Sequence, residues 1–329
     1  MQVDFKKSSI QIGDNSIIRG YFFYLRLVIT NRMLSKNKNL LLLHFIVFIW
    51  GWSPILGKLI TINAFQLIWF RMLIAVIAVF IYIIFIKQKL GIARKDLLQL
   101  FAIGAVIAFH WVCFYHAIKI SNVSVTLVAF ATGTLFTSII EPIFYKRKII
   151  RYELIFGMVI IGAIAMIFKV ETQYAWGIIF GILAAITSSF FTVFNGLLVR
   201  RLPSTIITVY ELGGGFIALS AYLLITGDFN QAFFSISPLD WGWLLLLSLI
   251  ATAFTFVASL NVMKKVSPYT MVLTVNLETI YGIIIAYFIW KKDEAMTPGF
   301  YIGTLIILAT VFGDGILKNY LKKKEKALQ

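Results

Sequence analysis

The chain has 329 residues, of which 60% are hydrophobic and 13% charged, and its formal net charge is +16. Soluble domains carry about 25% charged residues, so the composition excludes a soluble protein and indicates one that crosses a membrane several times. A positive net charge can indicate nucleic-acid binding. Here the basic residues gather in short connections between apolar segments, which predicts a lipid bilayer and no nucleic acid as the partner. The single cysteine, Cys113, excludes an internal disulfide and a cysteine-rich metal site.

Residues 1–38 are basic and contain only a short apolar piece, Tyr21–Ile29. That piece is too short to span a bilayer, which takes about 20 residues. No small-residue cleavage site follows it, as a signal peptide would require. Two interpretations stay open: a basic cytoplasmic tail, or an extension from a wrongly assigned start codon, with Met33 as the true start.

Ten apolar segments follow the tail. They lie at about 40–60, 65–86, 97–118, 123–145, 152–168, 174–197, 205–226, 240–262, 269–290 and 299–317. Most have the length of a membrane-spanning helix, while the fifth and the tenth are at the short end. A helix satisfies all its backbone hydrogen bonds internally, which makes it the viable form of such a segment in lipid. The sequence therefore predicts an all-α polytopic membrane protein with ten transmembrane helices.

The connections between these segments predict the orientation. Counting from the tail, every second connection is rich in Lys and Arg, as at 87–95, 146–151 and 264–265. The alternate connections hold few basic residues. Basic loops stay on the cytoplasmic side of a membrane, so both termini are expected to be cytoplasmic.

The chain also repeats itself. Lys119–Ser121, before the fourth segment, has a counterpart in Lys265–Ser267, before the ninth. The offset of five helices is odd, so the second half is expected to be inserted upside down relative to the first. Inverted repeats are typical of secondary transporters with a substrate site near the midplane. We expect five-helix repeats at 39–170 and 171–318, followed by a basic cytoplasmic tail at 319–329.

Several motifs within these repeats point to a family. They are Trp50–Pro54 in the first helix, Arg71 in the second, Phe114–Lys119 at the end of the third and Leu277-Glu278 in the ninth. With ten helices in two halves, the region 40–317 resembles the EamA-type members of the drug/metabolite transporter superfamily. The resemblance implies a carrier of the bacterial inner membrane, often an exporter of amino acids or other small metabolites, that uses neither ATP nor a cofactor.

Two positions depart from the family pattern. The family usually has a proline after the glutamate of the ninth helix, where this chain has Thr279. A proline removes a backbone donor and loosens a helix, so its absence argues against a proline-hinge mechanism here. In the fourth helix the comparable pair is Thr132-Gly133, and a separate Glu141-Pro142 stands nearer the cytoplasmic end.

Glu278 is the first candidate site residue. It lies near the middle of the ninth segment, and a carboxylate there costs roughly 2.5 kcal/mol or more unless it faces the bundle interior or a water-filled cavity. It is a candidate for binding a cationic group or carrying a proton. The alternative is a protonated glutamate that bonds to a neighbouring helix.

Arg71 and Glu211 form a second pair of candidates. They occupy similar positions in the two halves and could pair across the pseudo-symmetry axis or act as gate residues. They could also bind the carboxylate and the ammonium group of an amino acid, because Arg suits a carboxylate through its two-pronged geometry. A structural ion pair is the alternative. Gly213–Gly215 follow Glu211, and we expect them to allow close helix packing rather than a helix break.

His110, Trp111 and Tyr115 lie on the third helix together with His116. Histidine can change its charge near neutral pH, but ordinary hydrogen-bonded histidines are expected in preference to a proton relay. Six residues separate the two histidines, which does not put both on one helix face. No metal site is therefore expected.

Aromatic and amide side chains complete the candidate set. Trp50 and Tyr210 are candidates for lining a substrate cavity, although anchoring at the headgroups also explains aromatic residues in membrane proteins. Asn195 and Asn276 are candidate midplane contacts, with bonding between helices as the default. Lys58, near the end of the first helix, is expected to extend to the outer surface.

The sequence thus predicts a secondary transporter that exports a small metabolite, such as an amino acid, by alternating access. The alternative within this class is import or exchange of another solute, for example a nucleotide-sugar or an organic cation. The alternatives outside it are an intramembrane enzyme acting on lipid, with Glu278 or His110 as acid or base, and a membrane scaffold without transport. An enzyme is not expected, because the chain lacks a P-loop, a GxSxG, an HExxH and a dinucleotide motif. No oligomeric state is indicated.

Overall fold

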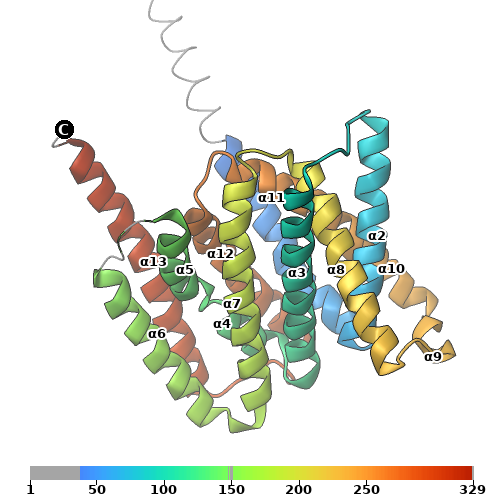
Figure 1. Ribbon diagram of the computed structural model, residues 1–329. Coiled ribbons are helices and arrows are strands. Elements are labelled where there is room, and N and C mark those ends of the chain that lie inside the picture. The colour runs from blue at the N-terminus through green and yellow to red at the C-terminus, as the bar shows by residue number, and fades with distance from the viewer. Residues whose placement is uncertain (1–37, 147, 149–150, 328–329) are drawn as a thin grey trace, which may run out of the picture. The chain divides into compact units, whose positions relative to one another are not determined.

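The computed structural model describes residues 38–146, 148 and 151–327. The chain divides into two compact units, Met1–Leu41 and Leu42–Gln329, and the fold reported below is that of the second unit (Figure 1). The regular structure of the described residues is helical, with no strand among them. The two interpretations of the N-terminal segment concern residues 1–37, which lie outside the described residues.

Nine helices of the described residues are long and apolar enough to cross a membrane, and a tenth apolar helix is shorter. The helices are Lys38–Leu59, α2 (Ala64–Phe85), α3 (Arg94–Ile120), α4 (Val123–Phe130), α5 (Gly133–Tyr145), α6 (Arg151–Val170), η1 (Thr172–Tyr174), α7 (Ala175–Leu198), α8 (Ser204–Thr226), α9 (Gln231–Phe234), α10 (Pro238–Ser248), η2 (Leu249–Phe254), α11 (Thr255–Met263), α12 (Pro268–Trp290) and α13 (Pro298–Ala327). The predicted all-α class and the ten apolar segments are confirmed, the fourth being formed by α4 and α5 and the eighth by α10, η2 and α11.

Local sequence signals set where several helices begin. Asn63 caps α2, Asn122 caps α4 and Ser267 caps α12, each side chain accepting a hydrogen bond from a backbone N–H in the first turn of its helix. Pro268 follows Ser267 at the first helical position of α12, where a missing N–H costs nothing. The repeated Lys-x-Ser motif thus precedes a helix start in both halves, although Asn122 provides the cap of α4.

Two membrane segments depart from a regular helix. The fourth segment breaks at Ala131 and Thr132, and the Thr132 hydroxyl bonds to the carbonyl oxygen of Ala129 at 2.6 Å. The eighth segment contains the π-helical stretch η2. Irregular backbone at membrane depth is tolerated only where protein covers it or a cavity lies beside it, and π-helical turns are frequent at functional sites. Both irregularities therefore point to the region between these segments.

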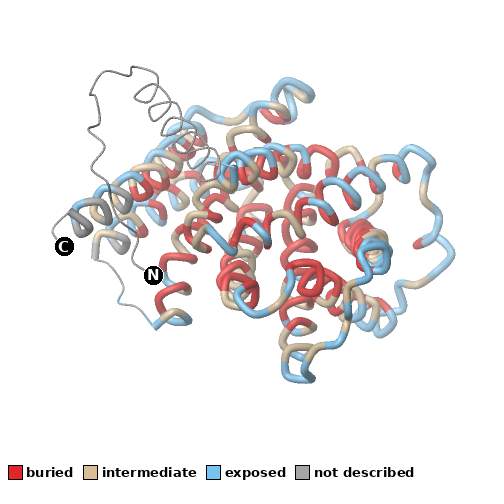
Figure 2. Tube along the Cα trace, turned by 90° about the horizontal axis from the view of Figure 1, so that it is seen from above, coloured by how far each residue is buried: buried red, intermediate tan, exposed pale blue. Residues whose placement is uncertain are grey.

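The surface of the second unit suits a lipid environment. Many large apolar residues are exposed, among them Phe85 and Ile225, with exposed fractions of 83% and 86%. Buried residues lie on the sides of the helices that face one another (Figure 2). Exposed apolar area on this scale is unusual for a soluble protein and fits contact with acyl chains.

Glycines allow α3 and α8 to pack closely. A Cβ added at Gly104 of α3 would meet the backbone of Glu211 and Gly215, and one added at Gly215 would meet the backbone of Gly104. The helix α8 continues through Gly213–Gly215 without a break. As expected from the sequence, the glycines serve close packing of helices.

We expect Gly215→Ala to lower the stability of the protein by about 1–3 kcal/mol, because overpacking against backbone forces the two helices apart. Gly213→Ala is the matched control on the same helix, since nothing lies within 4 Å of the added Cβ and alanine favours a helix by about 1 kcal/mol over glycine. Thermal unfolding in detergent measures both variants. Equal unfolding temperatures for the two would contradict the packing argument.

The side chain of Lys58 does not lie where the sequence predicts. Instead of extending to the surface, its Nζ lies 2.7 Å from Glu294 Oε1, and the Glu294 side chain is fully buried. Glu294 also accepts hydrogen bonds from the backbone N–H groups of Val123 and Ser124 at the start of α4. This contact ties the end of the first helix to α4 and to the connection after α12. The partner lies far away in sequence, so only the tertiary structure brings it to Lys58.

Candidate functional site

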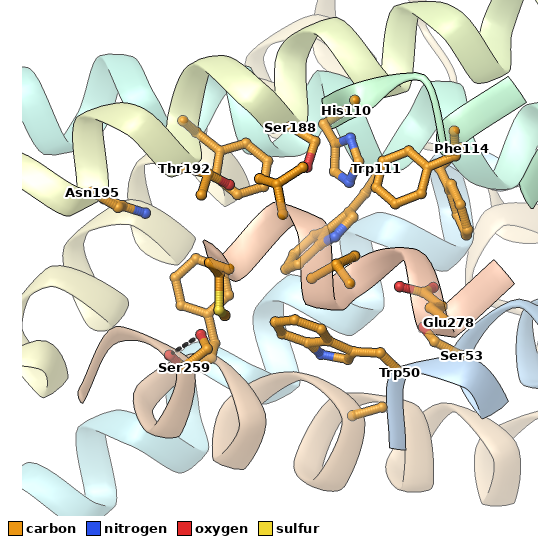
Figure 3. A pocket seen from close by; sticks show the side chains of 18 of the residues that line it. Trp50, Ser53, His110, Trp111, Phe114, Ser188, Thr192, Asn195, Ser259 and Glu278 are labelled. Atoms are coloured by element: carbon orange, nitrogen blue, oxygen red, sulfur yellow. Dashed lines mark hydrogen bonds between the residues drawn. The ribbon is translucent and has the colours of Figure 1, made fainter. Parts of the chain in front are cut away.

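A cavity of about 110 Å³ lies beside the two irregular segments, and residues of both segments and of the neighbouring helices line it (Figure 3). Drug-sized ligands occupy pockets of about 300–1,000 Å³, so this cavity suits a small solute. Its walls are mostly apolar and aromatic, with a few polar groups. They are formed by Trp50, Ser53, Arg71, His110, Trp111, Phe114, Tyr115, Phe130, Gly133, Ser188, Phe191, Thr192, Asn195, Ala251, Phe256, Ser259, Leu260, Met263, Met271, Val272, Val275, Asn276 and Glu278.

Eight of the ten site residues named from the sequence line this cavity. They are Trp50, Arg71, His110, Trp111, Tyr115, Asn195, Asn276 and Glu278. The other two, Tyr210 and Glu211, do not. The Tyr210 hydroxyl bonds to the carbonyl oxygen of Leu90 at 2.9 Å, and Glu211 is fully buried on α8.

Arg71 of α2 is fixed by neighbours on three sides. Its Nε donates to Thr252 Oγ1 at 2.6 Å, and its Nη1 donates to Tyr115 Oη at 2.8 Å. The ring of Trp111 lies 4.0 Å from the guanidinium carbon, a cation–π distance. Nη2 makes no hydrogen bond with the described residues.

A polar chain extends from Arg71 in two directions. On one side, the hydroxyls of Tyr115 and Ser53 lie 2.6 Å apart. On the other side, the Thr252 hydroxyl bonds to the carbonyl oxygen of Leu247, five residues earlier, within the π-helical region. Thr252 can therefore accept from Arg71 while its own proton is used. The π-helical stretch thus has an identifiable role in holding the arginine.

Glu278 of α12 faces the same cavity without a partner. Its carboxylate makes no hydrogen bond or salt bridge with the described residues, although the side chain is only 6% exposed. Arg71 lines the same cavity, and no salt bridge joins the two side chains. A basic and an acidic side chain thus face the same cavity without direct contact.

His110 of α3 has a defined ring orientation. Its Nδ1 lies 2.8 Å from the carbonyl oxygen of Ala184, so the proton is on Nδ1 and Nε2 is left as an acceptor. The rings of Phe130 and Phe191 lie 5.6 and 5.3 Å away. The histidine is hydrogen-bonded within an aromatic wall, which is the default interpretation of the sequence.

The break between α4 and α5 borders the cavity and is stabilised from two helices. Asn276 of α12 donates to Thr134 Oγ1 at 2.6 Å, and the Ser189 hydroxyl of α7 donates to the carbonyl oxygen of Gly133 at 2.8 Å. A discontinuous helix near the midplane is a usual feature of transporter sites. The two side chains satisfy backbone and hydroxyl groups that the break would leave unpaired.

Sequence reasoning missed several polar residues of the wall. Ser188 and Thr192 lie four residues apart on α7, and Asn195 follows three residues later, so all three share one helix face. This spacing was available in the sequence as a signal. Ser53 and Ser259 carry no comparable signal, because a lone serine in an apolar helix usually bonds to its own backbone.

A pairing of Arg71 with Glu211, one of the roles left open by the sequence, is not found. Arg71 bonds to Thr252 and Tyr115, whereas Glu211 accepts a hydrogen bond from Asn195 Nδ2 at 3.1 Å. Glu278 takes the place of Glu211 as the acidic group that faces the cavity with Arg71. Within the described ranges, no group of three or more His, Cys, Asp or Glu side chains could hold a metal ion.

Comparison with known proteins adds a family and a fold. A model of the EamA-like transporter family matches the chain twice, at residues 37–169 and 175–313. A solved crystal structure, described only as that of a protein, aligns with 85% of this chain and 97% of its own at a TM-score of 0.61 and 11% identity. At that identity the likeness concerns the fold alone. No curated protein matches the sequence. The two segments that the family model matches agree with the predicted pair of repeats.

Proposed function

Because the chain belongs to the EamA-like transporter family, an integral membrane protein family, we propose that it is a secondary transporter for a small zwitterionic metabolite such as an amino acid. The proposed mechanism is alternating access around the cavity between its two five-helix halves. One observation carries the proposal: Arg71 and Glu278, a basic and an acidic side chain, face the same cavity and are not joined by a salt bridge.

The proposed pose follows from the free groups. The carboxylate of the solute binds the unoccupied edge of the Arg71 guanidinium, and its ammonium group binds Glu278. Charge-assisted hydrogen bonds of this kind are about twice as strong as neutral ones. A zwitterion also neutralises both buried charges, which an amine or a carboxylic acid alone does not.

The remaining wall favours an apolar side chain on the solute. Trp50 and Trp111 contribute aromatic surface, and Met263 and Met271 contribute flexible apolar surface that can adapt to its shape. Trp50 is itself fixed, because its Nε1 donates to Thr255 Oγ1 at 2.9 Å. A neutral amino acid with a hydrophobic side chain fits this combination of charge and surface.

The proposed direction of transport, export, rests on a difference between the two ends of the helices that line the cavity. The cavity wall extends to Met263 and Met271, on either side of Lys264-Lys265, which belongs to a basic connection expected on the cytoplasmic side. The opposite ends are tied by the Lys58–Glu294 contact. A cavity closed on the outside and approached from the cytoplasm would load a solute for export across the inner membrane.

We expect purified wild-type protein in proteoliposomes to exchange a labelled neutral amino acid. The unlabelled amino acid should compete at least tenfold better than the matching amine or the matching carboxylic acid, because only the zwitterion satisfies both charges. Exchange inhibition by the three compounds measures this preference. Equal competition by the amine or the acid would contradict the zwitterion, and absence of exchange would contradict the carrier.

A further inference from the structure

Glu211 and Asn195 form a buried pair that the proposed binding of a solute does not use. Glu211 of α8 has an exposed fraction of 0%, and Asn195 of α7 has one of 1%. Asn195 Nδ2 donates to Glu211 Oε2 at 3.1 Å. The other oxygens of the pair, Glu211 Oε1 and Asn195 Oδ1, are both buried and have no hydrogen-bond partner among the described residues. Such unsatisfied groups are uncommon in native proteins and need an explanation.

Among the residues that the structure describes, no cation compensates an ionised Glu211. On the helices packed against α8, Arg71 of α2 bonds to Thr252 and Tyr115, while on α3 His110 bonds to Ala184 and Asp96 pairs with Arg201. The other basic groups of α3 also lie elsewhere: Arg94 and Lys95 are exposed, His116 contacts the ring of Phe180, and Lys119 donates to the carbonyl oxygen of Ile60. The helices α7 and α11 carry no ionisable side chain. A lone charged carboxylate inside a membrane bundle is costly.

A single proton removes both defects. An ionised glutamate and an asparagine carbonyl are both acceptors only, so neither can satisfy the other. A proton on Glu211 Oε1 makes it a donor to Asn195 Oδ1, while Asn195 Nδ2 continues to donate to Oε2. The pair would then carry no net charge and could form two reciprocal hydrogen bonds.

Asn195 also belongs to the cavity wall, at the end opposite to Glu278 (Figure 3). Its side chain therefore separates Glu211 from the space where a solute would bind. We propose that Glu211 and Asn195 form a proton-binding site that opens to the cavity when Asn195 turns toward a bound solute. The Glu211 carboxyl group is then open to water in the cavity, which hydrates the carboxylate and accepts the proton. Its link to a solute rests on the function proposed above.

In this arrangement the proton and the solute exclude each other. The proton is held when Asn195 pairs with Glu211, and it leaves when Asn195 bonds to the solute. A carrier that holds one ligand at a time moves them as an antiporter. The solute is therefore expected to accumulate in the more acidic compartment of a proteoliposome, as protons leave that compartment.

Infrared spectroscopy tests the proton site without any transport. The carbonyl band of a protonated carboxylic acid should be present in the wild-type protein at neutral pH and reduced in Glu211→Gln. Asn195→Ala is the second variant, and it should shift the band to higher frequency, because the acid loses its hydrogen-bond partner. Glutamine can form the same reciprocal pair with Asn195, so Glu211→Gln should remain folded. No band assignable to Glu211 would overturn the proposal.

Transport then tests the coupling. Glu211→Gln should retain exchange of the labelled amino acid within about twofold and lose accumulation driven by a pH gradient. Asp228→Asn, at an exposed site, is the matched control and should keep both. Accumulation at the wild-type level in Glu211→Gln would overturn the proposal. If the wild-type protein moves no amino acid, the function proposed above fails, while the infrared band still decides whether the proton site exists.

Discussion

Replacement of Arg71 by glutamine is expected to reduce exchange of a zwitterionic solute by about 100-fold or more. Glutamine keeps a polar side chain but removes the charge that binds the carboxylate. The solute carboxylate and Glu278 would then share a cavity with no cation from the protein. Breaking a buried pair by removing one partner costs about 3–5 kcal/mol, and each 1.4 kcal/mol corresponds to a factor of ten.

Arg71→Lys separates charge from geometry. Lysine retains the charge but cannot donate from Nε to Thr252 and from Nη1 to Tyr115 at once, so the side chain should be misplaced. We expect exchange to fall by about tenfold in this variant. Arg201→Gln is the control, because Arg201 pairs with Asp96 at an exposed site. Normal exchange in a folded Arg71→Gln protein would show that Arg71 has only a structural role.

Replacement of Glu278 by glutamine is the second large effect that we expect. Exchange of the zwitterion should fall by about 100-fold, because its ammonium group loses the carboxylate that compensates it. The preference should also change. Arg71 would then be the only charged side chain of the pair, so the matching carboxylic acid should compete as well as the amino acid or better. Competition by the three compounds in proteoliposomes measures both effects.

Two comparisons make this result specific. Asp228→Asn removes an exposed carboxylate and should leave exchange unchanged. The double variant Arg71→Gln with Glu278→Gln should be more stable than the sum of the two single effects predicts, because each single change leaves an uncompensated charge. Thermal unfolding of the four proteins measures this coupling. Exchange within twofold of wild type in Glu278→Gln would show that Glu278 contributes to packing and does not bind the solute.

Much of the architecture could be predicted from the sequence because a bilayer sets local rules. A span needs about 20 apolar residues, so long helices such as Ala64–Phe85 follow from the length and apolar character of their segments. An ionisable residue inside such a span needs a cavity or a partner, which is why Arg71 and Glu278 could be named before any contact was known.

The sequence could not predict which way each side chain points. Successive residues of a helix are turned by about 100°, but in a membrane both the lipid and a neighbouring helix are apolar. Hydrophobicity therefore does not distinguish the cavity side of a helix from the lipid side. Glu211 and Glu278 look alike in sequence, and only the packing of α8 and α12 assigned one to Asn195 and the other to the cavity.

The sequence by itself determined the class, the ten apolar segments and the short set of buried polar residues, because each depends on the composition of one stretch of chain. The tertiary structure decided the partners: Lys58 with Glu294, Tyr210 with Leu90, and Arg71 with Thr252 of the π-helical stretch. These contacts join residues far apart in the chain. They follow from how the helices pack, and helix packing in a membrane depends on shape and on hydrogen bonds between helices that no single segment contains.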